Sequence, residues 1–451
     1  MRRLGVLLPL GLLIAGCETI PVPVGAPAPR PAVAEPVVAT STPRPVPKTA
    51  GSLAGTAFGA SVRNAVLAHP RLGQAAAQVG SALADLEAAK GAFRPALSTG
   101  IDFRSEVSGR DGDRRDAVDP YVRVSQLIYD GGVSRHQKAA ATADVARAED
   151  DRIATAASVA MAAVEAQVNL ASAYQELALR RENLTTHKSF LSQMQERRDV
   201  GAGSESDYMT ARSRFADAQT ALVDAEAEVE RNRALYAEAF GIAASGSTVF
   251  PPQAPDLLTN QSQALSQSPR LRTLDAQIAA SQARLAVARA GRIPRIEAGG
   301  TALPGDDGGA DVVFDLSVEY QFDTRRQSAA GIQRAEADVN GLMAEKDLLL
   351  RDITRALEFL ASDRIAGQKR LSVAQTAVSA NRLNVAAARD EFLIGRSTLL
   401  DVLDKQRDYI NAQQRVIAAR ADQILVGYQA LALTGDIVPV FGIATGEGDR
   451  L

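Results

Sequence analysis

Apolar residues recur at seven-residue intervals through two long stretches of the chain. Residues 132–200 and 325–394 contain no proline, so nothing of that kind interrupts a helix there. At 1.5 Å per residue, each stretch would form a helix about 100 Å long. The recurring positions are Leu170, Tyr174, Leu177, Leu184 and Leu191 in the first stretch, and Leu350, Leu357, Leu371, Val378, Val385 and Phe392 in the second. A heptad sustained this far predicts a left-handed coiled-coil seam.

The segment after each long stretch repeats this spacing. The turns at residues 200–203 and 394–397 are short and contain glycine, so each long helix is expected to fold back on a partner. The returning positions are Tyr208, Phe215, Leu222, Val229 and Tyr236, and then Leu403, Ile410, Ile417, Ile424 and Leu431. The pattern predicts two antiparallel helical hairpins in each chain.

Ahead of each long stretch the period changes from seven to two. Leu97, Thr99, Ile101 and Phe103 alternate with polar or small residues, and a second strand is predicted at residues 121–129. The second half repeats this at 296–301 and 312–322. Loops rich in Gly and Asp separate the strands of each pair. This alternation is typical of membrane β-strands, although an ordinary soluble hairpin produces it too.

An internal duplication relates the two halves. The segment at residues 69–72 recurs at 268–271, and Pro95 recurs as Pro294. Further along, Gly201, Asp207 and Gly241 recur as Gly395, Asp401 and Gly435, each 194 residues later. We predict a first repeat at 53–241 with a helix at 58–91, a connector at 242–268, a second repeat at 269–435 and a tail at 436–451. The fold class is mainly α with a small β part.

The number of predicted strands implies that several copies of the chain assemble. The most apolar internal segment, residues 154–170, carries Glu165, Gln167 and Asn169, which disfavours a spanning helix. Any membrane crossing must therefore be a barrel, and membrane barrels need at least about eight strands. Four strands per chain cannot close one. Three copies would give twelve strands and, continuing from them, a tube of long helices.

The N-terminus is predicted to be a lipoprotein signal. Arg2 and Arg3 precede a short apolar stretch, and Cys17 is the only cysteine. Residues 14–17, Ile-Ala-Gly-Cys, resemble a bacterial lipobox, which makes residues 1–16 the signal peptide and Cys17 the acylated residue. A plain signal peptide with a chance cysteine is the alternative. Glu18 rather than aspartate favours delivery to the outer membrane. Residues 17–52 are rich in proline and form a semi-rigid tether.

Composition and isolated side chains give no sign of catalysis. The 50 basic and 53 acidic residues nearly balance, which gives no electrostatic reason to expect nucleic acid. His69, His136 and His187 are isolated, without the spacing of metal ligands, and are expected to be surface residues. No phosphate-binding loop or nucleophile elbow is present. We therefore expect no enzymatic activity, no cofactor and no metal.

Residues 53–440 resemble the outer-membrane efflux protein family, the TolC-like channels. The matching motifs are Ser-Gln-Leu-Ile-Tyr-Asp-Gly-Gly at 125–132 and Gly-Arg-Ser-Thr-Leu-Leu-Asp-Val-Leu-Asp at 395–404. The resemblance implies a homotrimer with a twelve-stranded barrel in the outer membrane of a Gram-negative bacterium and a helical tunnel in the periplasm. It also implies a periplasmic adaptor that docks at the hairpin tips, marked here by Gly201, Gly203, Gly395 and Arg396.

The same resemblance assigns acidic residues to the closed entrance. Asp401 and Asp404 would form rings of carboxylates round the channel axis, with Asp207 as a candidate from the first hairpin. Acid at a helix start is also favoured by the helix dipole, so a purely local role remains an alternative for all three. The two interpretations differ because a ring requires these residues to face the lumen.

Two other functions share some of these features. A periplasmic adaptor also carries a signal, a lipid anchor and a coiled-coil hairpin, but it has one hairpin between Gly- and Val-rich β domains. A structural coiled-coil lipoprotein has no need of two strand pairs at equivalent places. For a channel, drug or small-molecule efflux and type I protein secretion stay open, and the inner-membrane pump is either proton-driven or an ABC transporter. The lipobox favours efflux.

Overall fold

A computed structural model describes residues 51–108, 113–246, 248–255, 265–304, 309–323 and 325–443. The predicted signal peptide, Cys17 and the tether up to residue 50 lie outside these ranges.

Both halves of the chain contain the same succession of elements. After α1 (Ala57–Ala68), the first half runs α2 (Pro70–Lys90), β1 (Ala96–Ser108), β2 (Asp113–Tyr129), α3 (Val133–Asp199) and α4 (Glu205–Phe240). The second half runs α6 (Pro269–Ala290), β3 (Arg295–Pro304), β4 (Ala310–Glu319), α7 (Gln327–Leu393) and α8 (Leu399–Thr434), followed by the short α9 (Ile437–Val440). The fold is mainly α with one small sheet, which confirms the predicted fold class.

The predicted helix at 58–91 is two helices, because the chain breaks at His69. His69 is extended, with φ −73° and ψ 130°, as expected for a residue that precedes proline. Its Nδ1 accepts a hydrogen bond from the backbone amide of Arg71, at 3.1 Å, and so caps the start of α2. Pro70 occupies the first turn of α2, where the missing amide hydrogen costs nothing.

The four strands form one antiparallel sheet in the order β1-β2-β3-β4. One row across it pairs Leu97 with Val124, Val124 with Gly300, and Gly300 with Phe314. Leu97 is 74% exposed and Phe314 is 84% exposed, so a predominantly apolar face is open to the surroundings. This is the face that the alternation predicted. Strand β2 begins earlier than predicted, at Asp113, and β4 ends earlier, at Glu319.

The opposite face of the sheet is polar. Arg123 of β2 forms an ion pair with Asp315 of β4, at 3.4 Å. The pair reaches across β3 at Gly299, where a Cβ atom would come within 2.6 Å of the Asp315 carboxylate. A larger residue at position 299 would therefore disturb this contact.

Each long helix begins just after a strand, and the two junctions differ. At the first, the buried carboxylate of Asp130 accepts hydrogen bonds from the amides of Gly132 (3.0 Å) and Ser134 (2.7 Å), and Gly132 has a φ of 91°. At the second, Asp323 caps α7 in the same manner. There Arg326 occupies the left-handed position, with a φ of 54°, in place of glycine.

Helix α3 is the central element of the helical region. It contacts α1, α2, α4, α6, α8 and α9. It is long and apolar enough to cross a bilayer, with a window of mean hydropathy 1.3, but 61% of that window is buried. Alanines such as Ala160 and Ala163 are fully buried there and allow neighbouring helices to approach closely. The apolar character of α3 is therefore explained by packing inside the protein.

The start of the predicted tail belongs to the core. Ile437, Val440 and Phe441 are fully buried beside Tyr428 of α8. The backbone amides of Gly51 and Leu53 donate to the carbonyls of Pro439 and Val440, at 2.8 and 3.2 Å. The first and last described segments of the chain are thus joined at this core.

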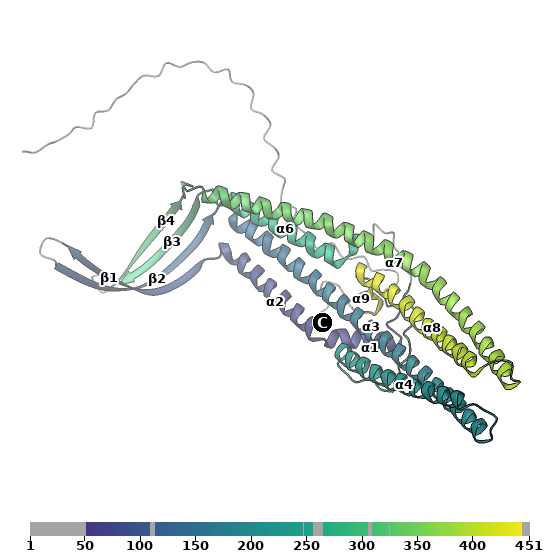
Figure 1. The fold of residues 1–451 in the computed structure, drawn as a ribbon. Coiled ribbons are helices and arrows are strands. Elements are labelled where there is room, and N and C mark those ends of the chain that lie inside the picture. Colours follow the sequence, from purple (N-terminus) through teal and green to yellow (C-terminus); the bar gives the residue numbers. More distant parts are fainter. Residues whose placement is uncertain are drawn as a thin grey trace, which may run out of the picture. The chain divides into compact units, whose positions relative to one another are not determined.

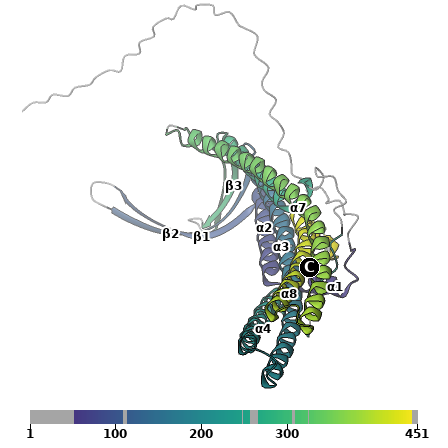
Figure 2. The ribbon, with the colours of Figure 1, turned by 45° about the vertical axis from the view of Figure 1, so that its right-hand side comes forward.

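The heptad seams lie where the sequence predicted them. Leu177 packs with Val229 between α3 and α4, while Leu357 and Ile410 are buried on α7 and α8. The sheet adjoins one end of α3 and α7, and the turns into α4 and α8 lie at the other end (Figure 1). Contacts between elements follow the order α4, α3, α8 and α7 (Figure 2).

Candidate entrance at the hairpin tips

The turns that close the two hairpins have the same backbone geometry. Gly201 and Gly395 have φ values of 75° and 73°, a conformation that glycine adopts without strain. In the first turn, the amides of Gly201 and Ala202 donate to the carbonyls of Arg198 and Arg197. In the second, the amides of Gly395 and Arg396 donate to the carbonyls of Phe392 and Glu391. Both turns are Schellman motifs, which end a helix and reverse the chain in a few residues.

The returning helices begin with similar caps. The Ser204 hydroxyl accepts a hydrogen bond from the amide of Asp207, at 3.0 Å, and the Thr398 hydroxyl accepts one from the amide of Asp401, at 3.2 Å. At α8 the bond is reciprocated, because the Asp401 carboxylate accepts from the Thr398 amide at 3.0 Å. The hydrogen bond from the Thr398 side chain, with that from its amide, lowers the pKa of Asp401. Asp401 is exposed and ionised at neutral pH.

Asp404 lies one turn further along α8, on the same side of the helix as Asp401. It is partly buried and forms an ion pair with Arg407, at 3.3 Å. It also lines a cavity of about 190 Å³ between α3, α4 and α8. Asp207 starts α4 in the other hairpin, and among the described residues it forms no bond with either aspartate of α8.

The tips of the two hairpins share one apolar cluster. Its buried members are Phe190, Met194, Ala211, Ala388, Phe392, Leu399, Val402 and Leu403, which come from α3, α4, α7 and α8. Two guanidinium groups cross between the hairpins, with Arg197 4.8 Å from the Phe392 ring centre and Arg389 5.1 Å from that of Phe190. Each contact combines apolar stacking with cation–π attraction. The tips are therefore held together as one unit within the protomer.

Gly203 is sterically constrained. A Cβ atom at this position would lie 3.0 Å from the Cβ of Arg197, tighter than ordinary packing allows. At Gly201 and Gly395, in contrast, a Cβ would meet nothing within 4 Å, and only the backbone conformation requires glycine. Glycine is thus required at position 203 by the space available, and at positions 201 and 395 by the backbone conformation.

The prediction that all three histidines lie at the surface was wrong for His187. Its side chain is only 9% exposed, and it lines the same cavity as Asp404. Its Nδ1 is buried without a hydrogen-bond partner among the described residues. Burial, followed by the nearby charge of Arg214, lowers the pKa of His187, while Asp217 opposes the shift. The sequence held no signal for this, because the cavity is formed by helices distant in the chain.

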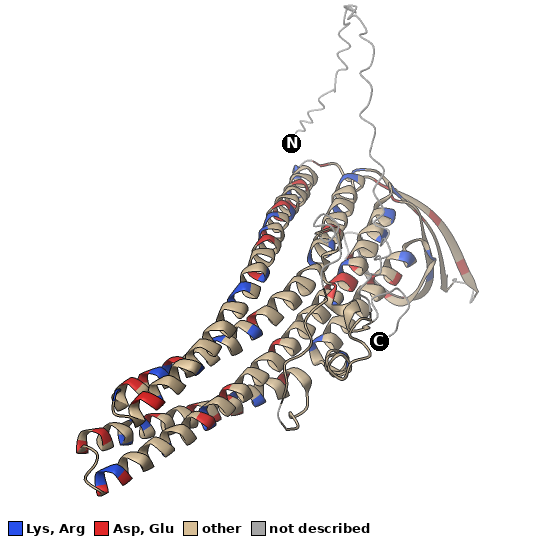
Figure 3. Ribbon diagram, turned by 90° about the vertical axis from the view of Figure 1, so that its right-hand side faces the viewer, with Lys and Arg blue, Asp and Glu red and all other residues tan. Residues whose placement is uncertain are grey.

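Charged residues of both signs lie at the hairpin tips (Figure 3). They include Arg197, Arg198 and Asp199 in the first hairpin, and Arg396 and Asp401 in the second. Charged side chains are mostly found in contact with water, so the tips suit an aqueous environment.

Comparison with known proteins identifies the family. The family model described as outer membrane efflux protein matches residues 62–241 and 260–432. The chain belongs to this family. The outer membrane efflux protein BepC of Brucella suis biovar 1 (strain 1330) is 24% identical over 366 residues, covering 77% of this chain and 78% of that protein.

Solved structures of outer-membrane channels share the fold of this efflux protein. VceC of Vibrio cholerae superposes with a TM-score of 0.76 at 15% identity, covering 84% of this chain and 96% of that one. The channel OprN superposes with a TM-score of 0.78 at 20% identity, covering 94% and 99%. The family match confirms the predicted family and export function, and these superpositions confirm the predicted fold. The family is one of ducts rather than enzymes.

Proposed function

We propose that three copies of this efflux protein form one channel. The observation that supports this most directly is the pair of free edges on each protomer. Within the described residues, β1 pairs only with β2 and β4 pairs only with β3. In the hairpins, α4 lies at one end of the order of contacts and α7 lies at the other. Head-to-tail repetition would pair each free edge with its counterpart, and three copies of four strands give twelve.

The hairpin tips would form the periplasmic entrance of this channel. In the trimer, Asp401 and Asp404 of each chain would surround the axis, with Asp207 contributing from α4. The exposed, ionised carboxylate of Asp401 supports an electrostatic role, because it carries a negative charge at the surface of the tip. Asp404 is partly compensated by Arg407, so its contribution would be smaller.

The tips would also be the docking site for a periplasmic adaptor. Gly201, Gly203, Gly395 and Arg396 occupy the two turns, where they are available to a partner that bridges to an inner-membrane pump. We propose that the system exports drugs or other small molecules, in keeping with the efflux relative BepC. Acylation of Cys17 would attach the chain to the outer membrane in addition to the barrel.

The mass of the channel in detergent tests the assembly. Native mass spectrometry should give a particle of three chains, and a planar bilayer should show conductance from that particle. A folded monomer that conducts by itself would contradict the proposal. Deletion of the gene should raise drug susceptibility; loss of one secreted protein with unchanged susceptibility would instead assign the channel to type I secretion.

A further inference from the structure

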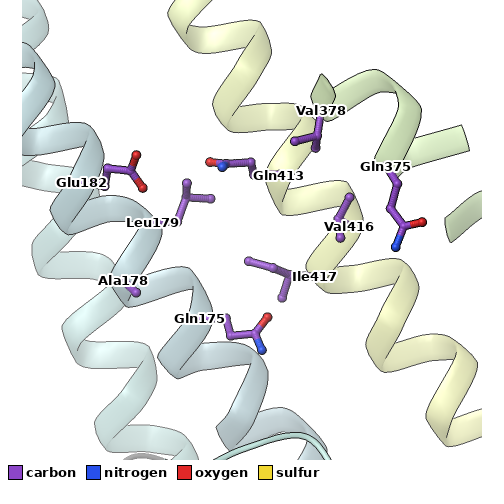
Figure 4. Close-up of a pocket in the computed structure, with 9 residues that line it drawn as sticks. All are labelled: Gln175, Ala178, Leu179, Glu182, Gln375, Val378, Gln413, Val416 and Ile417. Carbon is purple, nitrogen blue, oxygen red and sulfur yellow. The ribbon is translucent and has the colours of Figure 1, made fainter. Parts of the chain in front are cut away.

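A second pocket lies on the seam between the two hairpins, about halfway along the paired helices. Its walls are apolar and come from three helices: Ala178 and Leu179 of α3, Val378 of α7, and Val416 and Ile417 of α8 (Figure 4). The volume is about 470 Å³. Pockets that hold drug-sized molecules fall in the range of roughly 300–1,000 Å³. This cavity, called the seam pocket below, is therefore large enough for a small organic ligand.

The polar groups of the seam pocket are mostly uncharged. Gln175, Gln375 and Gln413 contribute amides, and Glu182 is the only charged residue in the lining. No ion-pair partner is recorded for Glu182 within the described helices. Glu176, a turn and a half earlier on α3, is instead satisfied by Arg180 and by Gln414, both at 2.7 Å. Glu182 is exposed, so water solvates its carboxylate in the free protein, and this carboxylate can pair with a cationic ligand that enters the pocket.

Gln413 adds an acceptor without a partner. Its Nε2 donates to the hydroxyl of Tyr409, at 2.9 Å, which orients the amide. Its Oε1 is buried with no hydrogen-bond partner in the described part of the chain. Figure 4 shows Gln413 extending from α8 towards the side of the pocket that Glu182 lines. A carboxylate and an unused carbonyl oxygen at one apolar cavity both favour a positively charged ligand.

The seam pocket and the Asp404 cavity lie on opposite faces of α8. At about 100° per residue, Gln413 is about half a turn round the helix from Asp404, and Val416 and Ile417 flank that direction. A ligand in the seam pocket would therefore not compete with ions at the aspartates of the tips. It would contact α3 of one hairpin and both helices of the other.

We propose that the seam pocket is a binding site for amphipathic organic cations. The apolar walls would bury the body of the ligand, while Glu182 and the Gln413 carbonyl would face its charge. Because such a ligand touches both hairpins, its binding would stabilise their packing against each other. The site is formed within one protomer, so the inference does not depend on the proposed trimer or its gate.

Equilibrium dialysis against the intact detergent-solubilised protein tests this proposal. The probes are tetraphenylphosphonium and tetraphenylborate, which are similar in size and shape but opposite in charge, with a detergent-only blank. Glu182→Gln removes the charge. Ala178→Trp fills the pocket from an exposed position, so the larger side chain need not enter a core. Glu196→Gln is the matched control, since Glu196 is exposed on the same helix two heptads further on and outside the pocket.

Tetraphenylphosphonium should bind saturably above the blank, and tetraphenylborate should not. Loss of one partly solvated charge should weaken binding about fivefold in Glu182→Gln, and added salt should reduce the difference. Ala178→Trp should abolish saturable binding, and Glu196→Gln should leave it unchanged. Three results would overturn the proposal: no saturable binding of the cation, equal binding of the anion, or wild-type affinity in Glu182→Gln. The seam pocket would then be a contact surface for a protein partner. If Ala178→Trp fails to assemble, Glu182→Gln and the two probes still decide.

Discussion

Asp401 accepts hydrogen bonds from both the hydroxyl and the amide of Thr398, at 2.6 and 3.0 Å, and its own amide donates to the same hydroxyl. Asp401, which is proposed to line the entrance, therefore also caps the first turn of α8. Any substitution of Asp401 changes a charge and a helix cap together. Experiments at the tip must separate these two effects.

Thr398→Ala should loosen the first turn of α8 without changing the charge of the tip. Loss of an N-cap costs about 1 kcal/mol, so the amides of residues 399–403 should exchange with deuterium several-fold faster. Ser204→Ala is the matched control in the other hairpin. It should have a smaller effect on α4, because there the Asp207 amide donates to the Ser204 hydroxyl without the reciprocal bond seen at α8. Equal effects on the two helices would show that the reciprocal bond adds nothing.

Gly201→Val and Gly395→Val should abolish export while the trimer remains intact. Both glycines have positive φ, where a β-branched residue is strained by about 1–3 kcal/mol, so each turn should change shape. Binding of the purified adaptor and drug susceptibility are the measurements. Gly341→Val is the control, since Gly341 is exposed inside α7 and a Cβ atom there would meet nothing within 4 Å. Full export from a variant that carries both Gly201→Val and Gly395→Val would exclude docking at these turns.

The repeating parts of this fold could be predicted from the sequence. Heptads and strand alternation are local periodicities, and each determines which face of an element is buried. The features that were missed depend on distant partners. Ile437 and Phe441 are buried only because α1, α3 and α8 converge on them, and nothing in their own segment indicates this. The break at His69 is different, because Pro70 is a local signal of a helix start that the surrounding helical pattern obscures.

The candidate site was only partly visible in the sequence. The repeated spacing placed Asp207 and Asp401 at equivalent helix starts, which the structure confirms. Burial of His187 and the lone charge of Glu182 in the seam pocket could not be predicted, because each depends on how α3 packs against α8. A single side chain in a heptad repeat does not reveal which neighbour covers it.

Mild acid should loosen the contact of α3 with α8 at the tips. Burial lowers the pKa of His187 below its ordinary value of 6.5 in the packed state. A state that exposes His187 therefore binds more protons, and the packed state loses stability as pH falls through 6.5 towards the lowered pKa. Above pH 6.5 the packing is at full strength. The charged groups that line the same cavity are Arg180 on α3, Arg214 and Asp217 on α4, and Asp404 and Arg407 on α8.

Deuterium exchange at residues 183–190, followed from pH 7.5 to 5.5 and corrected for intrinsic rates, measures this effect. Exchange in the wild type should rise as pH falls, and His187→Gln should remove that dependence. His136→Gln is the control, because His136 lies at the other end of α3 and its pKa is also lowered, chiefly by burial. If the pH dependence of exchange persists in His187→Gln, it arises from the carboxylates of the cavity, Asp217 and Asp404, and not from His187.

Cys17 should carry the lipid. Globomycin should cause the unprocessed precursor to accumulate, and Cys17→Ser should abolish labelling with a radioactive fatty acid. The proposed barrel would provide its own attachment to the membrane, so export should persist in the variant. Normal processing and membrane recovery of the wild type without any lipid label would rule out the lipoprotein assignment.

Carboxylates at the entrance should make the channel selective for cations. Three chains, each with Asp401 and Asp404, would place six acidic groups around a narrow axis, where like charges attract counter-ions. Asp404→Asn and Asp401→Asn should each weaken cation selectivity and block by multivalent cations in a planar bilayer. The effect of Asp401→Asn should be larger, because Asp404 is paired with Arg407. High salt should reduce these differences, since the Debye length is about 8 Å at physiological ionic strength.

Thr398→Ala separates charge from helix capping in this experiment. It removes the cap of α8 but leaves every carboxylate in place, so cation selectivity should remain near the wild-type value. If Thr398→Ala lowers selectivity as much as Asp401→Asn does, the aspartate acts through the start of the helix. If neither aspartate variant changes selectivity or block, both residues are helix-start groups and the gate lies elsewhere. A ring of carboxylates is supported only if cation selectivity falls in the two aspartate variants and stays near the wild-type value in Thr398→Ala. Only that result ties ion selection to charged groups that face the lumen.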